Sequence, residues 1–235
     1  MASSNSIDAL DLYAKVEDLL GIKEYAPKLY SYYFNILDNL KFNSLLDIGC
    51  GSGDFLVELQ NRYSNAIFDG IDKSSFMVEL AKSKELRVEN IELKLVNRSY
   101  DIATATFDMI NYLTPNEFIE FFEDLKRVVK KYFIFDVNTE FGLSDLAVGN
   151  FIAQDDSRFL TIESFYEGGV YDSIFTLFKK EQRCYKKSTN SIRQYYYNEE
   201  FFNLLGGWKL RSKLPIKLYD MEMPDKVIYL LEKQN

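Results

Sequence analysis

Apolar side chains over the first forty residues recur at the three- and four-residue spacing of amphipathic helices. One helix is predicted over 7–20, where Gly21 ends it, and a second carries an apolar stripe over 29–40 with Pro27 in its first turn. Helices of this kind bury one face only. We therefore expect residues 1–40 to form a helical lid on a larger body.

From residue 45 the pattern changes to short apolar runs that alternate with helical spacing. Residues 45–48 and 66–72 read as strands, and each is followed by a turn and a helix. Further strands are predicted within 87–95, 100–107 and 132–137. Alternating strands and helices indicate a parallel sheet with right-handed crossovers.

A capped helix separates the last two of these strands. Thr114 and Glu117 form the capping-box pattern, Pro115 stands at the first helical position, and the apolar face begins at Phe118. This segment gives the clearest helix prediction of the chain.

The alternation stops after Asn138. Strands are predicted at 159–166, 170–178 and 191–197, followed by a short helix and a closing hairpin at 208–218 and 226–231. The expected organisation is a helical lid at 1–40, a core at 41–138 and 198–235, and an antiparallel β insertion at 139–197 that caps a substrate.

Composition removes several classes of function. The chain has no histidine, which excludes serine–histidine and cysteine–histidine hydrolases and histidine-ligated metalloenzymes, and a formal charge of −8 argues against nucleic acid as a partner. Two cysteines cannot build a disulfide framework. With no leader pattern and no apolar run of membrane-spanning length, the sequence predicts a cytoplasmic protein without a membrane partner.

The glycine turn after the first strand carries the most specific chemistry. Its spacing is G-x-G-x-G, and Asp54 stands where the third glycine of a dinucleotide fingerprint would be. Asp47 precedes the turn, and a carboxylate there favours an ammonium over a phosphate. S-adenosylmethionine carries an ammonium and no phosphate. Asp72, at the end of the next strand, can accept both hydroxyls of its ribose. A structural turn with an exposed acid is the alternative.

At these residues the chain resembles the class I S-adenosylmethionine-dependent methyltransferases. It is most similar to a bacterial branch of small-molecule methyltransferases with an antiparallel insertion after the fifth strand. Other shared motifs are Tyr100–Ile102, Asp108–Leu113, Ile134–Asn138 and Asp225–Tyr229. The resemblance implies an α/β fold: a Rossmann-like seven-stranded sheet, its last strand antiparallel, with helices on both faces.

The resemblance also implies which residues hold the cofactor. Asp47 and the turn backbone would hold the methionine portion, and the Cys50 side chain would only fill the turn. Relatives carry an Asp-hydrophobic pair at the adenine, where this chain has Asn90-Ile91, and a solvated turn asparagine is the alternative. Tyrosines of the lid either cover the cofactor or belong to the core. The full set of cofactor-binding candidates is Tyr25, Asp47, Gly49, Cys50, Gly51, Asp72, Lys73, Met77, Asn90, Ile91 and Phe107.

Substrate-facing candidates follow the fourth and fifth strands or lie in the insertion: Asp108, Asn111, Tyr112, Asn138 and Arg193. Asn111 and Tyr112 have packing of their loop as an alternative role. Arg193 belongs to an Arg-x-Tyr motif similar to that of the family, but the histidine that relatives often place three residues earlier is Asn190 here.

The favoured function is transfer of a methyl group from S-adenosylmethionine to nitrogen or oxygen of a small molecule, leaving S-adenosylhomocysteine. A sulfonium leaving group mainly requires positioning in a dry pocket, so a general base is optional, and Asp108 or a tyrosine could serve. No metal is expected. Methylation of transfer RNA or protein, or non-catalytic cofactor binding, are the alternatives, and monomer and homodimer both stay open.

Overall fold

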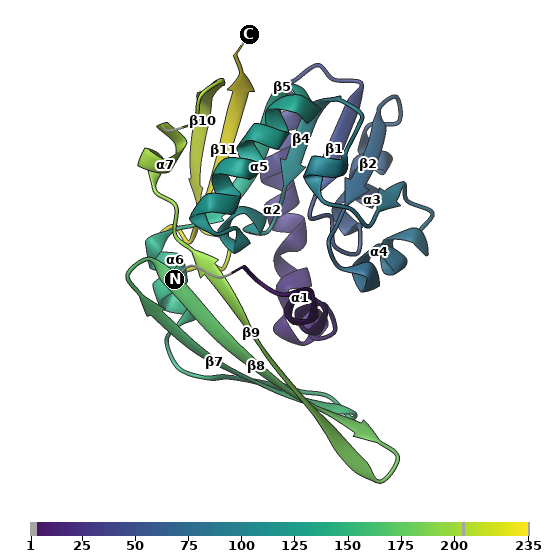
Figure 1. Ribbon diagram of the computed structural model, residues 1–235, viewed down its shortest axis with the longest axis vertical. Helices are drawn as coiled ribbons and strands as arrows, with labels where there is room; N and C mark the ends of the chain where they lie inside the picture. The colour runs from purple at the N-terminus through teal and green to yellow at the C-terminus, as the bar shows by residue number, and fades with distance from the viewer. Residues whose placement is uncertain (1–3, 204, 235) are drawn as a thin grey trace.

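The computed structural model describes residues 4–203 and 205–234, which form two sheets and the helices around them (Figure 1). The larger sheet has seven strands in the order β10-β11-β5-β4-β1-β2-β3. The strands run as follows: β1 Ser44–Ile48, β2 Ile67–Ile71, β3 Val88–Glu89, β4 Tyr100–Ala105, β5 Val129–Asn138, β10 Trp208–Ile216 and β11 Lys226–Lys233. Strands β1 to β5 are mutually parallel, and β11 is antiparallel to both of its neighbours. The predicted seven-stranded fold is confirmed.

Helices cover both faces of this sheet because successive strand residues point to opposite sides. On one face Leu45 and Ile134 pack against the apolar stripes of α2 (Ile22–Leu37), α3 (Asp54–Arg62) and α4 (Ser75–Lys82). On the other, Phe133 and Phe135 pack against α5 (Pro115–Val128) and α7 (Glu199–Asn203). The predicted capping box of α5 is confirmed, since Thr114 and Glu117 each accept from the other's backbone N–H.

The insertion forms a four-stranded antiparallel sheet in the order β6-β7-β8-β9. Its strands are β6 Phe151–Gln154, β7 Arg158–Glu167, β8 Val170–Glu181 and β9 Cys184–Tyr195, and the last two make a long hairpin that extends from the body in Figure 1. Every second residue faces inward, and these side chains bury Leu12 of α1 (Ile7–Ala14) and Val16 just after this helix. The N-terminal segment is thus held between the insertion and the main sheet.

Several predicted details are wrong. The first helix ends at Ala14 and resumes as a 3₁₀ turn, η1 (Glu17–Leu20), before Gly21 adopts a left-handed backbone. Pro27 lies inside α2 rather than in its first turn, because burial of the later stripe outweighs the loss of one backbone hydrogen bond. The strand predicted within 87–95 is present there as β3, which has two residues.

Two short elements after Asn138 were not predicted from the sequence. These are α6 (Glu140–Leu146) and β6. Neither is long enough to show a clear period, and two of the four residues of β6, Phe151 and Ile152, are exposed apolar side chains.

Candidate functional site

A cavity of about 430 Å³ opens at the carboxyl ends of β1, β2 and β4, where ligands bind in open α/β sheets. The glycine turn, the segment after β2 and the end of β4 form its floor, and the N-terminal segment forms its roof. Tyr13, Glu17 and Tyr30 line it from above, while Phe107 and Tyr112 line it from the end of β4. The volume lies within the range of small-molecule sites.

The glycine turn is held tightly to the neighbouring strand. The N–H groups of Gly49 and Cys50 both donate to the Ile71 carbonyl, at 2.8 and 3.1 Å. Gly49 has a φ of +71°, and a Cβ there would lie 2.7 Å from Cγ of Met109. Glycine is therefore required at this position by both backbone and space.

Asp72 lines the cavity, and both of its carboxylate oxygens are held by backbone N–H groups. Its Oδ2 accepts from the Gly51 N–H at 2.9 Å and its Oδ1 from the Ser74 N–H at 2.8 Å. Each oxygen keeps further lone pairs for a ligand, and burial raises the pKa of this carboxyl. Two fixed acceptors side by side fit a pair of neighbouring hydroxyls such as those of a ribose.

Asp47 lies beneath the turn rather than in the cavity wall. Its side chain is 1% exposed and accepts from the Thr104 hydroxyl at 2.7 Å, and burial raises its pKa to about 7. It does not belong to the cavity lining. That Asp47 pairs with a methionine ammonium therefore stays a prediction.

Most of the other predicted cofactor residues are brought together around this cavity: Gly49, Cys50, Gly51, Asp72, Lys73, Met77, Ile91 and Phe107. Tyr25 and Asn90 lie outside its lining. The Tyr25 ring packs edge-to-face on Tyr219 with centroids 4.9 Å apart, and the Asn90 amide donates to the backbone carbonyls of Asp72 and Lys73. Asn90 thus fixes the backbone that carries Asp72.

The predicted substrate-facing residues separate into different environments. Tyr112 lines the cavity. Asn111 is fully buried, donates to the Tyr195 carbonyl and accepts from the Asn138 N–H, so it packs its loop. Arg193 forms a two-point ion pair with Asp172 on the insertion, at 2.6 and 2.7 Å, away from the cavity lining.

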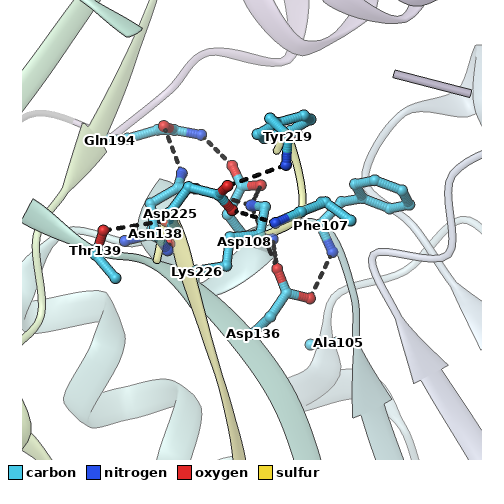
Figure 2. A network of polar contacts seen from close by, with 12 residues as sticks. Ala105, Phe107, Asp108, Asp136, Asn138, Thr139, Gln194, Tyr219, Asp225 and Lys226 are labelled. Carbon is cyan, nitrogen blue, oxygen red and sulfur yellow. Dashed lines mark hydrogen bonds and ion pairs between the residues drawn. The ribbon is translucent and has the colours of Figure 1, made fainter. Parts of the chain in front are cut away.

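Asp108 and Asn138 belong to a buried polar network around Lys226 (Figure 2). The Lys226 side chain is 0% exposed, and its Nζ contacts Asp108, Oδ1 of Asn138 at 2.8 Å and Oδ2 of Asp136 at 3.4 Å. Burial has the largest single effect and would lower the pKa of this ammonium, but the combined effects of Asp108, Tyr219 and Asp136 outweigh it and hold the pKa above its usual range. Gln194 of β9 donates to Asp108 at 2.5 Å and ties the insertion to the network.

The same network supports the end of β4. Phe107 and Asp108 both have positive φ, at 54° and 53°, which is rare for residues with side chains. Asp136 accepts from both of their N–H groups, at 2.9 and 2.8 Å, and from the Tyr33 hydroxyl at 2.7 Å. A fully buried carboxylate thus stabilises the strained backbone that places Phe107 in the cavity wall.

Sequence reasoning did not identify Lys226 or Glu17. Lys226 opens a strand pattern, where a lysine usually marks a solvent-facing end. Glu17 lies inside a stretch predicted as amphipathic helix, where an acid is normally solvated. Only the tertiary arrangement places Lys226 among buried carboxylates and Glu17 in the cavity lining.

Residues 45–132 match the family model of a methyltransferase domain. The chain therefore carries a methyltransferase domain over these residues. A solved S-adenosylmethionine-dependent methyltransferase from Clostridium acetobutylicum superposes with a TM-score of 0.76 at 21% identity, covering 95% of this chain and 100% of the other. The sugar N-methyltransferase KedS8 from Streptoalloteichus gives 0.73 at 14% identity, covering 100% and 96%. At these identities the likeness is one of fold.

The curated relatives match part of this chain over part of their own length. A malonyl-[acyl-carrier protein] O-methyltransferase from Priestia megaterium is 33% identical over 118 residues, which are 47% of this chain and 41% of the relative. A tRNA (guanine-N(7)-)-methyltransferase from Mycoplasmopsis pulmonis is 34% identical over 84 residues, 32% of this chain and 41% of the relative. The chain thus spans about two fifths of each. No helix within the described residues is long and apolar enough to cross a membrane.

Proposed function

We propose that the protein transfers a methyl group from S-adenosylmethionine to nitrogen or oxygen of a small molecule. The observation that carries the cofactor assignment is the Asp72 carboxylate, which two backbone N–H groups orient in a cavity at the sheet edge. A carboxylate in that position suits a ribose. The methyltransferase domain over 45–132 and the superposed methyltransferases support the same assignment.

The charges of the lining favour this cofactor over a phosphate-bearing dinucleotide. Among the described residues the lining has acids but no arginine, and each of its three lysines contacts an acid: Lys23 with Asp54 at 3.6 Å, Lys73 with Glu92 at 3.9 Å and Lys94 with Glu92 at 2.5 Å. Asp54 also opens α3, where a phosphate would otherwise approach the helix N-terminus. A phosphate group would therefore be repelled by the acids of the lining and by Asp54 at the N-terminus of α3.

The chain's own residues position the reactants and exclude water. When bound, S-adenosylmethionine supplies a methyl group on a positively charged sulfur, which becomes the neutral thioether of S-adenosylhomocysteine. The aromatic side chains Tyr30, Phe107 and Tyr112 line the cavity, and their faces suit a sulfonium as they suit an ammonium. An acceptor lone pair forms the new bond to the methyl carbon, the carbon–sulfur electron pair stays on sulfur, and the acceptor releases one proton.

The roof of the cavity, which the N-terminal segment forms, supports a small molecule as the methyl acceptor. The Asn5 side chain bonds both backbone groups of Arg193 on β9 and donates to the Tyr112 carbonyl, so the N-terminal segment joins the insertion across the roof. We assign residues 1–40 as the lid and 139–197 as the acceptor cap on this basis. The formal charge of −8 opposes transfer RNA as an acceptor.

Isothermal titration calorimetry with S-adenosylmethionine tests this function. We expect the parent protein to bind, and Asp72→Ala to bind about a hundredfold more weakly because two charge-assisted hydrogen bonds to the ribose are lost. Asp145→Ala, at an exposed position of α6 outside the cavity lining, is the matched control. A parent that fails to bind would refute the proposal, and a D72A variant with parental affinity would refute the ribose assignment.

A further inference from the structure

Among the described residues, one acid of the cavity lining is partly buried and yet has no hydrogen-bond or ion-pair partner. Asp72 is held by backbone N–H groups, Asp54 contacts Lys23 and Lys84, and Glu92 contacts Lys73 and Lys94. The Glu117 side chain is engaged in the capping box, Asp124 lies 3.9 Å from Arg127, and Glu120 is exposed. The half-buried Glu17 side chain forms no hydrogen bond or ion pair within residues 4–203 and 205–234.

Glu17 lines the cavity next to residues that pack on the insertion. Its neighbour Val16 is fully buried in the cluster formed by the inner face of the insertion sheet. Tyr13, one turn earlier, packs edge-to-face on Tyr112 with centroids 6.4 Å apart and on Phe175 of β8 at 5.9 Å. Glu17 therefore shares the cavity lining with Tyr13 and Tyr112, and Tyr13 links this part of the lining to the insertion, although no described residue of the insertion itself belongs to the lining.

The charges that act on Glu17 are mainly negative, with Lys23 the positive one among the strongest. Burial raises the pKa of the Glu17 carboxyl; Lys23 opposes the rise, and the negative charges of Asp54, Asp18 and Asp72 add to it. Tyr13 and Tyr30, whose pKa values burial raises, add no charge near neutral pH. A cation that enters beside Glu17 would relieve this repulsion and meet aromatic faces as well.

We propose that Glu17 anchors the methyl acceptor through its amino group, so that the acceptor is a small amine. This inference rests on the proposed function. The carboxylate accepts a hydrogen bond from the bound ammonium and then its proton, which frees the nitrogen lone pair. The nitrogen–carbon bond forms as the carbon–sulfur bond breaks, and the electron pair stays on sulfur. A carboxylate or phosphate acceptor would be repelled at the same place.

Two cofactor analogues separate this role from a contact with the cofactor itself. Sinefungin carries a primary amine where S-adenosylmethionine carries the sulfur-bound methyl, and S-adenosylhomocysteine carries nothing there. Both have the same α-ammonium and carboxylate. A carboxylate at the acceptor position therefore discriminates between the two analogues, whereas a partner of the α-ammonium does not.

The experiment is calorimetric titration of both analogues into the parent protein, Glu17→Gln and Glu24→Gln. Glu24 is an exposed residue of α2 outside the lining, so it gives a matched control. We expect E17Q to weaken sinefungin about tenfold while S-adenosylhomocysteine changes less than about twofold. E24Q should leave both affinities at the parental values.

Other outcomes overturn the inference in distinguishable ways. An equal loss for both analogues would assign Glu17 to the cofactor's α-ammonium, and unchanged affinities would show that Glu17 does not face the reacting position. If the parent binds neither analogue, the proposed function is refuted, and with it the role of Glu17 that rests on it. Thermal unfolding of both variants establishes that each one is folded.

Discussion

Replacing Lys226 by methionine should destabilise the fold strongly. The substitution keeps the unbranched side chain but removes a fully buried charge that contacts Asp108 and Asp136, whose side chains are 13% and 0% exposed. Removing one partner of a buried ion pair costs about 3–5 kcal/mol, because the remaining charges stay buried without compensation. A loss of that size is a large part of a total stability of about 5–15 kcal/mol. It corresponds to a melting temperature roughly 10 °C lower for a chain of this length.

The pH dependence of this loss has a defined sign. Burial already raises the pKa of Asp136, and Lys226 opposes that rise. Without the lysine, the folded-state pKa of Asp136 moves further above its unfolded value of about 3.9. The folded state then binds more protons than the unfolded state, so stability falls as pH rises from the unfolded pKa to the folded pKa. The loss of unfolding free energy caused by K226M should therefore be smaller at pH 5 than at pH 8.

Urea unfolding of the parent, K226M and Lys213→Met at pH 8 and pH 5 tests both the size of the stability loss and its pH dependence. Lys213 pairs with Glu199 at the surface with 39% of its side chain exposed, and its loss should cost less than about 1 kcal/mol. K226M combined with Asp108→Asn should recover part of the stability, because one uncompensated charge is removed. A deficit in K226M no larger than that of K213M, or one that grows at pH 5, would refute the reasoning.

Two further variants probe the supports of the site. Thr114→Ala removes the hydroxyl that accepts from the Glu117 N–H at 3.2 Å, and should lower the free energy of unfolding by about 1 kcal/mol in urea titration; an unchanged midpoint would contradict the capping box. Gly142→Ala places a Cβ 2.4 Å from the Asp225 carbonyl oxygen, so thermal unfolding should show that the free energy of unfolding falls by about 1–3 kcal/mol. Gly206→Ala is the control, because a Cβ there has nothing within 4 Å, and its stability should be close to that of the parent. Equal melting temperatures for the two glycine variants would contradict the close approach of α6 and β11.

The fold was predictable because its information is local and periodic. Short apolar runs, a capping box and the glycine turn each define an element without reference to the rest of the chain. Asp72 could be predicted in the same way, since carboxyl ends of parallel strands share one edge of a sheet. Its position on the cavity floor agrees with that prediction, although its role as a ribose ligand is a proposal.

The rest depends on contacts between distant segments. Lys226 and Asp108 are 118 residues apart, and no pattern around either residue indicates that they meet. Asp47 shows a different limit: a strand-end acid can face the ligand or the underside of the turn, and only the register of the neighbouring strands decides. Here Asp47 pairs in register with Thr104, whose hydroxyl binds it below the cavity.

The position of β11 in the sheet constrains the order in which this protein can fold. β11 lies between β5 and β10, and Tyr229 pairs with Phe135, so two strands that are neighbours in space are separated by most of the C-terminal half of the chain. Contacts of such long sequence separation slow folding, because a long loop must close before they form. During synthesis β5 keeps an unpaired edge until residues beyond 226 have emerged, and exposed strand edges favour pairing with other chains. The cap and its long hairpin are made in that interval, so they must fold beside an open sheet.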